Sequence, residues 1–153
     1  MVLETENKYL ENKYVLFKLD NEDYGLNIDN VLSIEKFQSC TRVPNAPEYV
    51  VGVINLRGEV IPILDLRKKL NLEPKPSDQN SRIIITSSND IVVGLIVDLS
   101  SEVLEINDEN IDKPSATGEK KFNDYIKGIG KDDKRLIIIL DLEKLLDIEQ
   151  TGC

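Results

Sequence analysis

Hydrophobic residues recur along this chain in short runs that polar turns separate. The clearest example is residues 50–70, VVGVINLRGEVIPILDLRKKL, where two apolar runs flank Arg57-Gly58 and Asp65 precedes a short amphipathic segment. Runs of this length, bounded by turn residues, are typical of β-strands. The stretch therefore predicts a hairpin and then a short helix capped by Asp65. Pro62 cannot donate to a ladder, so we expect it at an edge or a bulge.

The same pattern predicts a series of strands over the rest of the chain. They are expected at residues 14–19, 24–28, 31–37, 82–86, 91–97, 103–106, 124–129 and 135–140, with a second short helix at 142–148. Apolar positions out of phase in the third strand predict a bend or bulge near Ser33. Residues 71–81 read as a linker and residues 107–121 as a polar loop, and we expect flexible termini at 1–12 and 149–153.

The stretch 50–70 is repeated later in the chain. At a constant offset of 76 it aligns without a gap with residues 126–146, and the tetrapeptide ILDL is identical in both copies. Residues 14–70 and 82–146 would each hold five short strands and one helix. So few residues cannot cover both faces of an open sheet, whereas curling into a barrel removes most edges and makes a core. We predict a mainly β fold with two SH3-like five-stranded barrels related by a pseudo-twofold, within a single domain at 13–148.

Composition and charge exclude several classes of function. The net charge of −9 disfavours partners with phosphate backbones or anionic lipid surfaces, so nucleic-acid binding is not expected. No apolar run is long enough to span a bilayer, which argues against direct membrane insertion. The absence of histidine removes imidazole catalysis and nearly all zinc sites. Cys40 and Cys153 do not form a disulfide framework, which fits a reducing cytoplasm.

Two groups of carboxylates could suggest chemistry. Asp65 and Asp141 are equivalent in the repeat, as in an aspartic-protease dyad, but they lack the Asp-Thr/Ser-Gly context and precede helical segments. We interpret both as helix N-caps. The acidic residues within 107–112 lack the alternating ligands and the glycine of a calcium loop, so a solvated loop is expected. The sequence predicts no enzyme, no metal site and no cofactor.

Arg57 differs in kind from the other charges. It occupies the tip of the first repeated hairpin, where the second copy has Asp133. It is either a solvated turn charge or a contact that fixes a partner through its planar guanidinium. Ile28, Val31 and Ile34 follow at spacings of three, which does not fit the alternation of one strand. Either they belong to the first core, or some of them point into a groove between the barrels.

Two stretches carry a resemblance to a known family. The run VPNAPEYVVGVINLRG at 43–58 and the run VIPILDLR at 60–67 closely resemble the CheW family of bacterial chemotaxis coupling proteins. Segments 93–98 and 126–130 match this family more weakly. The resemblance covers residues 13–148. It implies a non-enzymatic cytoplasmic adaptor of two barrels, which is recruited to membrane receptor arrays.

The family resemblance also implies partners and a site. The partners would be the cytoplasmic tip of a chemoreceptor and the regulatory domain of the histidine kinase CheA. The receptor-binding groove would be formed by Val15, Ile28, Val31, Ile34, Gly52, Arg57 and Val103. Ser33 departs from the acidic residue of some relatives, and the kinase-facing residues, expected in the second half, cannot be named. The alternative interpretation is a different interaction module built on SH3-like barrels.

Overall fold

A computed structural model describes residues 12–113 and 124–146 of the chain. Most of the expected flexible termini and the end of the expected helix at 142–148 lie outside these residues. The strands are β1 (Lys13–Leu19), β2 (Glu22–Asn27), β3 (Val31–Lys36), β4 (Val50–Leu56), β5 (Glu59–Asp65), β6 (Arg82–Ser88), β7 (Ile91–Val97), β8 (Leu99–Glu105), β9 (Ile111–Asp112), β10 (Ile126–Asp132) and β11 (Arg135–Leu140). The helices are η1 (Ile28–Asn30), α2 (Leu66–Lys69), η2 (Asp108–Asn110) and α4 (Leu142–Leu145).

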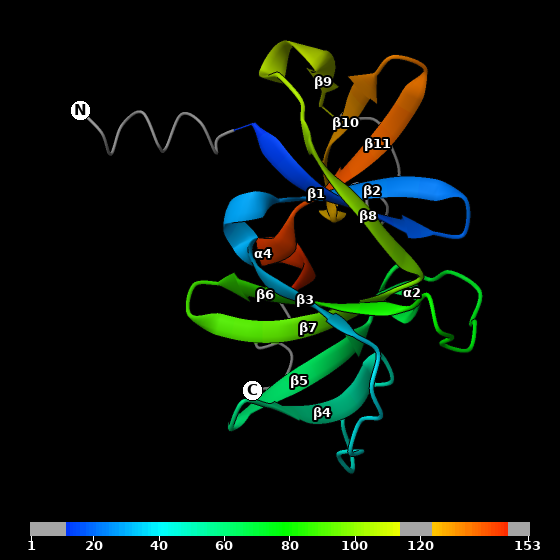
Figure 1. Cartoon of the computed structure of the whole chain (residues 1–153), viewed down its shortest axis with the longest axis vertical. Coiled ribbons are helices and arrows are strands. Elements are labelled where there is room, and N and C mark those ends of the chain that lie inside the picture. The colour runs from blue at the N-terminus through cyan, green and yellow to red at the C-terminus, as the bar shows by residue number, and fades with distance from the viewer. Residues whose placement is uncertain (1–11, 114–123, 147–153) are drawn as a thin grey trace. The chain divides into compact units, whose positions relative to one another are not determined.

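The strands form two sheets in two compact units (Figure 1). The terminal unit comprises Met1–Asn30 and Ser101–Cys153, and its six-stranded sheet has the order β8-β1-β2-β11-β10-β9. The central unit comprises Val31–Ser100, and its five-stranded sheet has the order β3-β6-β7-β5-β4. The predicted mainly β fold with short helices is confirmed, and the two predicted five-stranded barrels correspond to one sheet of six strands and one of five.

The sheets do not follow the expected division into residues 14–70 and 82–146. Strand β2 pairs in parallel with β11, and β7 pairs in parallel with β5, so each half donates its first hairpin to the last hairpin of the other half. The registers are equivalent: Gly25 faces Ile139, as Gly94 faces Ile63. The two halves of the sequence are copies. A first hairpin could therefore pair with the last hairpin of its own half or of the other half, and the same repeat positions would face each other in both cases. Sequence periodicity therefore cannot distinguish the two arrangements.

Each unit has a glycine over which a second segment of chain crosses. In the central unit, Thr41 forms a bridge with Val53 of β4 through two backbone hydrogen bonds of 2.8 Å. A Cβ on Gly52 would collide with the carbonyl group of Thr41. In the terminal unit, β9 crosses β10 in the same way, and Gly128 lies under it. The crossing segments connect the edge regions of each sheet, which is how these short sheets approach closure.

A β-bulge accompanies each of these glycines. The ladder register shifts between Val50 and Gly52, and again between Ile126 and Gly128. A bulge leaves one residue unpaired and re-aims its side chain. The re-aimed residues are Val51 and Lys127, which are equivalent at the offset of 76.

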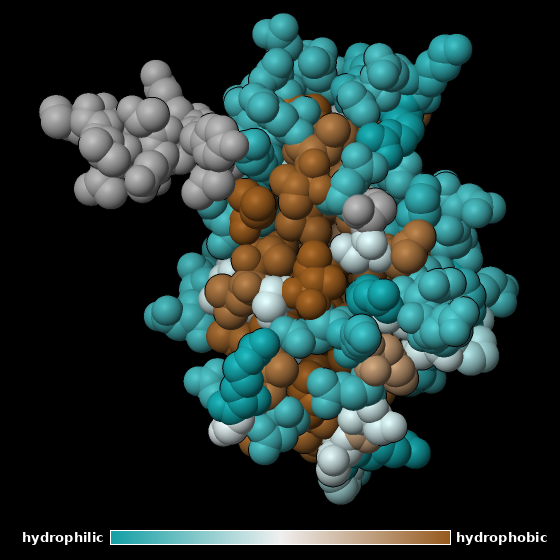
Figure 2. Space-filling view, viewed as in Figure 1, coloured by the Kyte–Doolittle hydropathy of each residue, from teal (hydrophilic) through white to brown (hydrophobic). Residues whose placement is uncertain are grey.

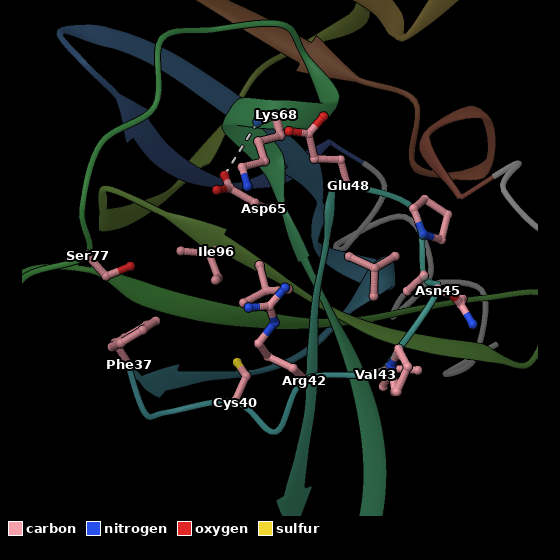
Figure 3. A pocket seen from close by; sticks show the side chains of 15 residues that line it. Phe37, Cys40, Arg42, Val43, Asn45, Glu48, Asp65, Lys68, Ser77 and Ile96 are labelled. Carbon is pink, nitrogen blue, oxygen red and sulfur yellow. Dashed lines mark hydrogen bonds between the residues drawn. The ribbon is translucent and has the colours of Figure 1, made fainter.

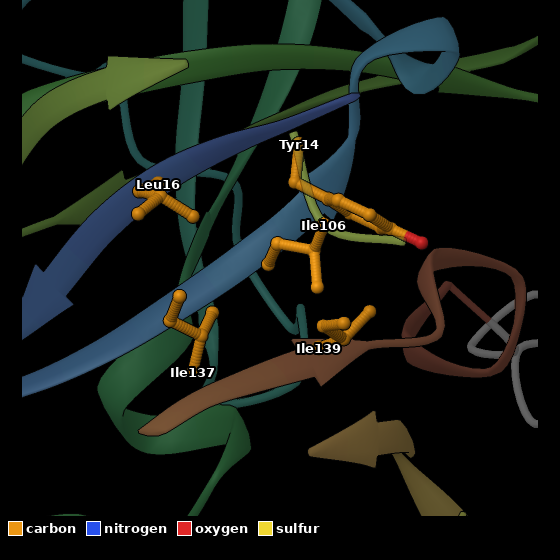
Figure 4. Close-up of a cluster of buried hydrophobic side chains, with 5 residues drawn as sticks. All are labelled: Tyr14, Leu16, Ile106, Ile137 and Ile139. Atoms are coloured by element: carbon orange, nitrogen blue, oxygen red, sulfur yellow. The ribbon is translucent and has the colours of Figure 1, made fainter. Parts of the chain in front are cut away.

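Both cores are aliphatic, as the composition predicts. In the terminal unit a buried cluster gathers side chains from β1, β11 and the residue that follows β8; its members are Tyr14, Leu16, Ile106, Ile137 and Ile139 (Figure 4). In the central unit the cluster comes from β4, β5 and β6; its members are Ile54, Ile61, Ile63, Ile83 and Ile85. Cluster residues on the same strand are two apart, so each cluster lies on one face of its sheet. Strands β1 and β6 are buried on both faces, because four consecutive residues are buried in each.

The expected helix caps are confirmed. The Asp65 carboxylate accepts hydrogen bonds from the backbone N–H groups of Arg67 (3.0 Å) and Lys68 (3.4 Å). The Asp141 carboxylate accepts one from Lys144 (3.2 Å). Each carboxylate satisfies backbone donors at the start of a helix, as the cap interpretation requires.

Pro62 lies at a local edge, as predicted. Its pairing partner Val53 directs both backbone groups to Thr41, so Pro62 shares no hydrogen-bonded pair with β4. The parallel pairing of β5 with β7 begins only at Ile63. Of the helices in the described part of the chain, none is long and apolar enough to cross a membrane.

Candidate partner-binding site

The tip of the β4–β5 hairpin is held in an unusual backbone conformation. Arg57 (φ 51°) and Gly58 (φ 88°) both have positive φ, which is the two-residue turn that matches the twist of a hairpin. Such turns favour Asn-Gly or Asp-Gly because these residues tolerate the left-handed region. The Asn55 side chain supports the turn by accepting a hydrogen bond from Gly58 N–H at 2.9 Å.

Arg57 is an exception among the left-handed residues of this chain. Among the described residues other than glycine, positive φ values occur at Asp20, Asn45, Arg57, Asn71, Asn89, Asp90 and Asp133. All except Arg57 are Asp or Asn, whose short polar side chains suit this region. An arginine there costs about 1 kcal/mol. The presence of arginine at such an unfavourable position suggests that this turn has a function.

The guanidinium of Arg57 remains largely free for another contact. It lies 3.6 Å from the Glu35 carboxylate of β3, and the Arg57 side chain is 73% exposed. Because the Arg57 side chain is mostly in solvent, an ion pair at this distance contributes little stability. In the terminal unit, by contrast, Arg135 donates hydrogen bonds to Glu102 of β8 (2.9 Å) and to Asp132 (3.0 Å). These hydrogen bonds raise the pKa of Arg135.

The predicted bulge in β3 is confirmed, and it places two of the predicted site residues together. Val31 pairs with Thr86 and Ile34 pairs with Ile84, with a register shift between Val31 and Ser33. Because Thr86 and Ile84 are two apart on β6, Val31 and Ile34 share one face of the sheet. This explains how residues three apart in a strand can contribute to one apolar edge.

That edge is partly open to solvent. Ile34 is 44% exposed and Leu32 59% exposed on β3, while Val31 is half-buried. Figure 2 has the same view as Figure 1. In the region where Figure 1 draws β3 to β5, it shows apolar side chains at the surface between polar ones. Arg57 belongs to the same unit and reaches β3 through Glu35, the neighbour of Ile34. Adjacent residues of a strand point to opposite faces, so Glu35 lies on the other face of β3 from Val31 and Ile34, and Arg57 reaches β3 on that other face.

The other predicted site residues lie elsewhere. Val103 is 51% exposed on β8, next to β1, which holds the buried Val15. Ile28 is half-buried in η1. All three belong to the terminal unit. At an offset of 69 residues, Val103 is equivalent to Ile34, and Val15 is equivalent to Ile84. Both units therefore have an exposed apolar residue at the same position of an edge strand.

Gly52 has a structural role in the described chain. It is buried at the β4 bulge beneath Thr41, so it presents no side chain and little surface to a partner. A pocket beside β4 was not predicted from the sequence. The loop with Pro44 and Pro47 was the signal that could have indicated the pocket, because it covers one of its walls. The described residues include no group of three or more His, Cys, Asp or Glu that could hold a metal ion.

Comparison with known proteins places the chain in a family. The CheW-like domain model matches residues 13–150. A chemotaxis protein CheW from Bacillus subtilis is 39% identical over 139 residues, covering 91% of this chain and 89% of that protein. A chemotaxis protein CheW from Klebsiella aerogenes is 36% identical over 138 residues, covering 90% of this chain and 83% of that protein.

A solved structure supports the same assignment. The crystal structure of the scaffolding protein TtCheW from Thermoanaerobacter tengcongensis matches with a TM-score of 0.83 and 38% sequence identity. The match covers 89% of this chain and 92% of that chain. The sequence resemblance to the CheW family is therefore confirmed. The chain belongs to the CheW-like family of chemotaxis scaffold proteins.

Proposed function

We propose that this chain is a non-enzymatic adaptor that couples the cytoplasmic tip of a chemoreceptor to the regulatory domain of the histidine kinase CheA. Its place would be the cytoplasm, at receptor arrays in the membrane. The carboxylates that could suggest hydrolysis, Asp65 and Asp141, are occupied by backbone donors of α2 and α4. This supports binding rather than catalysis as the activity.

The observation that carries the proposal is the conformation of Arg57. An exposed arginine is kept at a turn position where Asn would be more favourable for the fold, so the side chain is selected for what it contacts. On β3, which Arg57 reaches through Glu35, Ile34 forms an exposed apolar edge, and Val31 lies on the same face as Ile34. An amphipathic receptor helix would place apolar side chains on this edge and accept hydrogen bonds from the guanidinium.

The test compares Arg57→Asn with Asp133→Asn, the equivalent turn position of the terminal unit. Arg57→Asn creates the favoured Asn-Gly turn, so a loss of binding cannot be attributed to unfolding. We expect about a tenfold loss of affinity for a receptor cytoplasmic fragment, because a charge-assisted hydrogen bond is removed. Asp133→Asn should bind like the wild type, and binding to a CheA regulatory domain should persist in both variants.

A second variant, Val31→Arg, tests the apolar edge independently. It should weaken receptor binding while the amide NMR spectrum outside β3 is unchanged. Wild-type affinity in both Arg57→Asn and Val31→Arg would contradict this assignment of the receptor site. If the wild-type chain binds neither the receptor fragment nor the kinase domain, the coupling function itself is wrong.

A further inference from the structure

The central unit contains a cavity that is separate from the β3 edge. It has a volume of about 770 Å³ and lies between the segment that crosses β4, the bulged start of β4 and the end of β7. Its walls are apolar and polar in similar measure, and the apolar part includes Phe37, Val43, Val51 and Ile96 (Figure 3). Cavities of this size fit a drug-sized ligand or a few residues of peptide.

The terminal unit has a counterpart of this cavity. Its volume is about 410 Å³, and four positions that line it correspond to lining positions in the central unit. Asn27, Ile111, Lys113 and Lys127 take the places of Ile96, Cys40, Arg42 and Val51, respectively. The correspondence follows from the equivalent bridges Thr41–Val53 and Asp112–Ile129 and from the offset between the strands. The fold therefore forms this cavity twice.

Comparing the residues that line the two cavities shows which of them the fold requires to be apolar. Val51 and Ile96 pack against the core of the central unit, and this contact alone could explain why they are apolar. However, the terminal unit keeps the same backbone with Lys127 and Asn27 at these positions. An apolar lining is therefore not required by the bulge or by the crossing. The bulge aims Val51 into the larger cavity, which makes an apolar wall where its counterpart has a charge.

Arg42 supplies the polar part of the cavity. It follows the bridge residue Thr41 and is exposed, and no hydrogen bond or ion pair engages its side chain within the described residues. Of the five arginines in the chain, the other four each contact a carboxylate or a backbone carbonyl. An unengaged guanidinium beside apolar walls is suited to a carboxylate that belongs to an apolar ligand.

The acidic residues at the cavity do not neutralise Arg42. Asp65 caps α2 with its Oδ1 atom and forms no ion pair with Arg42 among the described residues. In Figure 3, Glu48 lies near Lys68 and away from Arg42. Burial raises the pKa of the Cys40 thiol, so this neighbour of Arg42 is neutral at pH 7. The position in front of the guanidinium is thus open to an anion.

We propose that this cavity binds a short peptide segment of a partner protein, in which an apolar side chain lies beside a carboxylate. The apolar side chain would contact Val51, Ile96 and Phe37, and the carboxylate would accept hydrogen bonds from Arg42. This site uses none of the residues assigned above to receptor binding. It would give the adaptor a second contact, whose specificity depends on charge as well as on apolar area.

The test uses two synthetic peptides, acetyl-LLEL-amide and acetyl-LLQL-amide, titrated into the full chain and followed by NMR. The glutamate peptide should shift the Arg42 side-chain N–H and the amide of Val51, and should bind about tenfold more tightly than the glutamine peptide. Arg42→Gln should remove that difference, whereas the matched variant Lys113→Gln should not. Val51→Lys, which copies the terminal unit, should weaken binding of both peptides.

Several results would overturn this proposal. They are equal affinity for the two peptides, an equal effect of Lys113→Gln and Arg42→Gln, or shifts that gather at Lys127 and Asn27 instead. Arg57→Asn serves as a control, because it should leave peptide binding unchanged. The peptide site can therefore fail while the proposed receptor site stands, and the reverse also holds.

Discussion

At the first turn of the short helix that ends each half, the central unit has Arg67 and the terminal unit has Glu143. Arg67 is only 4% exposed and donates two hydrogen bonds to Asp98, of 3.0 and 2.7 Å, and one of 2.6 Å to the carbonyl of Glu73. At the corresponding places the terminal unit has Glu143 and Asp29, which are both acidic and both exposed. The equivalent helices α2 and α4 are therefore held to their units by different side-chain interactions.

This difference shows how a duplicated fold can separate stability from binding. In the central unit, a buried, bidentate ion pair fixes α2 to the end of β7. Removing one partner of such a pair is strongly destabilising, because the other charge is left buried without compensation. With that helix fixed, the hairpin tip can carry a residue that does not favour the fold, Arg57. Four sets of substitutions, taken from the largest expected effect to the smallest, test this contrast.

Arg67→Ala should have the largest effect. Removing the arginine leaves Asp98 poorly hydrated, with Lys75 at 3.6 Å as a weaker partner, so we expect a loss of about 3–4 kcal/mol in the free energy of unfolding. Urea denaturation measures this loss. The matched variant Glu143→Ala should cost less than about 0.5 kcal/mol. Equal costs would mean that the two helices are fastened alike.

Gly52→Ala and Gly128→Ala compare the two crossings. A Cβ at Gly52 would meet the rigid carbonyl of Thr41, and its φ of +156° is unfavourable for a side chain. A Cβ at Gly128 would first meet the Cγ2 atom of Ile111 at 2.6 Å, a side chain that can rotate. We expect costs of about 3 kcal/mol and about 1–2 kcal/mol, respectively, from thermal unfolding. A larger cost at Gly128 would contradict this order.

Asp65→Ala and Asp141→Ala test the part that the two units share. Each carboxylate caps a short helix, so each substitution should cost about 1 kcal/mol in denaturant unfolding. Asp65 accepts two backbone hydrogen bonds and Asp141 accepts one, so the cost at Asp65 should be slightly greater. A difference of several-fold would show that the caps also serve a role outside the helices.

Arg57→Asn should have the smallest effect on stability, and in the opposite direction. Replacing an arginine in the left-handed region by asparagine should stabilise the chain by about 0.5–1 kcal/mol, because Asn-Gly suits this turn. The midpoint of urea unfolding would rise. A fall in the midpoint would instead mean that the ion pair with Glu35 stabilises more than the turn costs.

The sequence predicted the local features of this fold well. The hairpin at 50–65, the caps at Asp65 and Asp141 and the bulge near Ser33 depend on residues close together in the chain, so their patterns are sufficient. The prediction was less successful where distant segments meet. The β8 strand starts at Leu99 rather than at residue 103, because its pairing with β1, rather than its own pattern, decides where it begins.

The candidate site could be predicted only in part. The turn at Arg57 and the odd spacing of Val31 and Ile34 were visible as irregularities in a repeating pattern. The burial of Gly52 and the cavity at Arg42 depend on the crossing of Thr41 over β4, which no periodicity encodes. Each unit has a cavity. Only a comparison of the two cavities shows which lining residues the fold requires and which it does not.

The exchange of hairpins between the halves has a consequence for the order of synthesis. The central unit is one continuous segment, Val31–Ser100, and can complete its sheet as soon as that segment leaves the ribosome. The hairpin of β1 and β2 must wait for β11, which is made more than 100 residues later. We expect nascent chains of intermediate length to protect β3–β7 from protease while β1 and β2 remain sensitive. The first strands of this protein would then be among the last to find their partners.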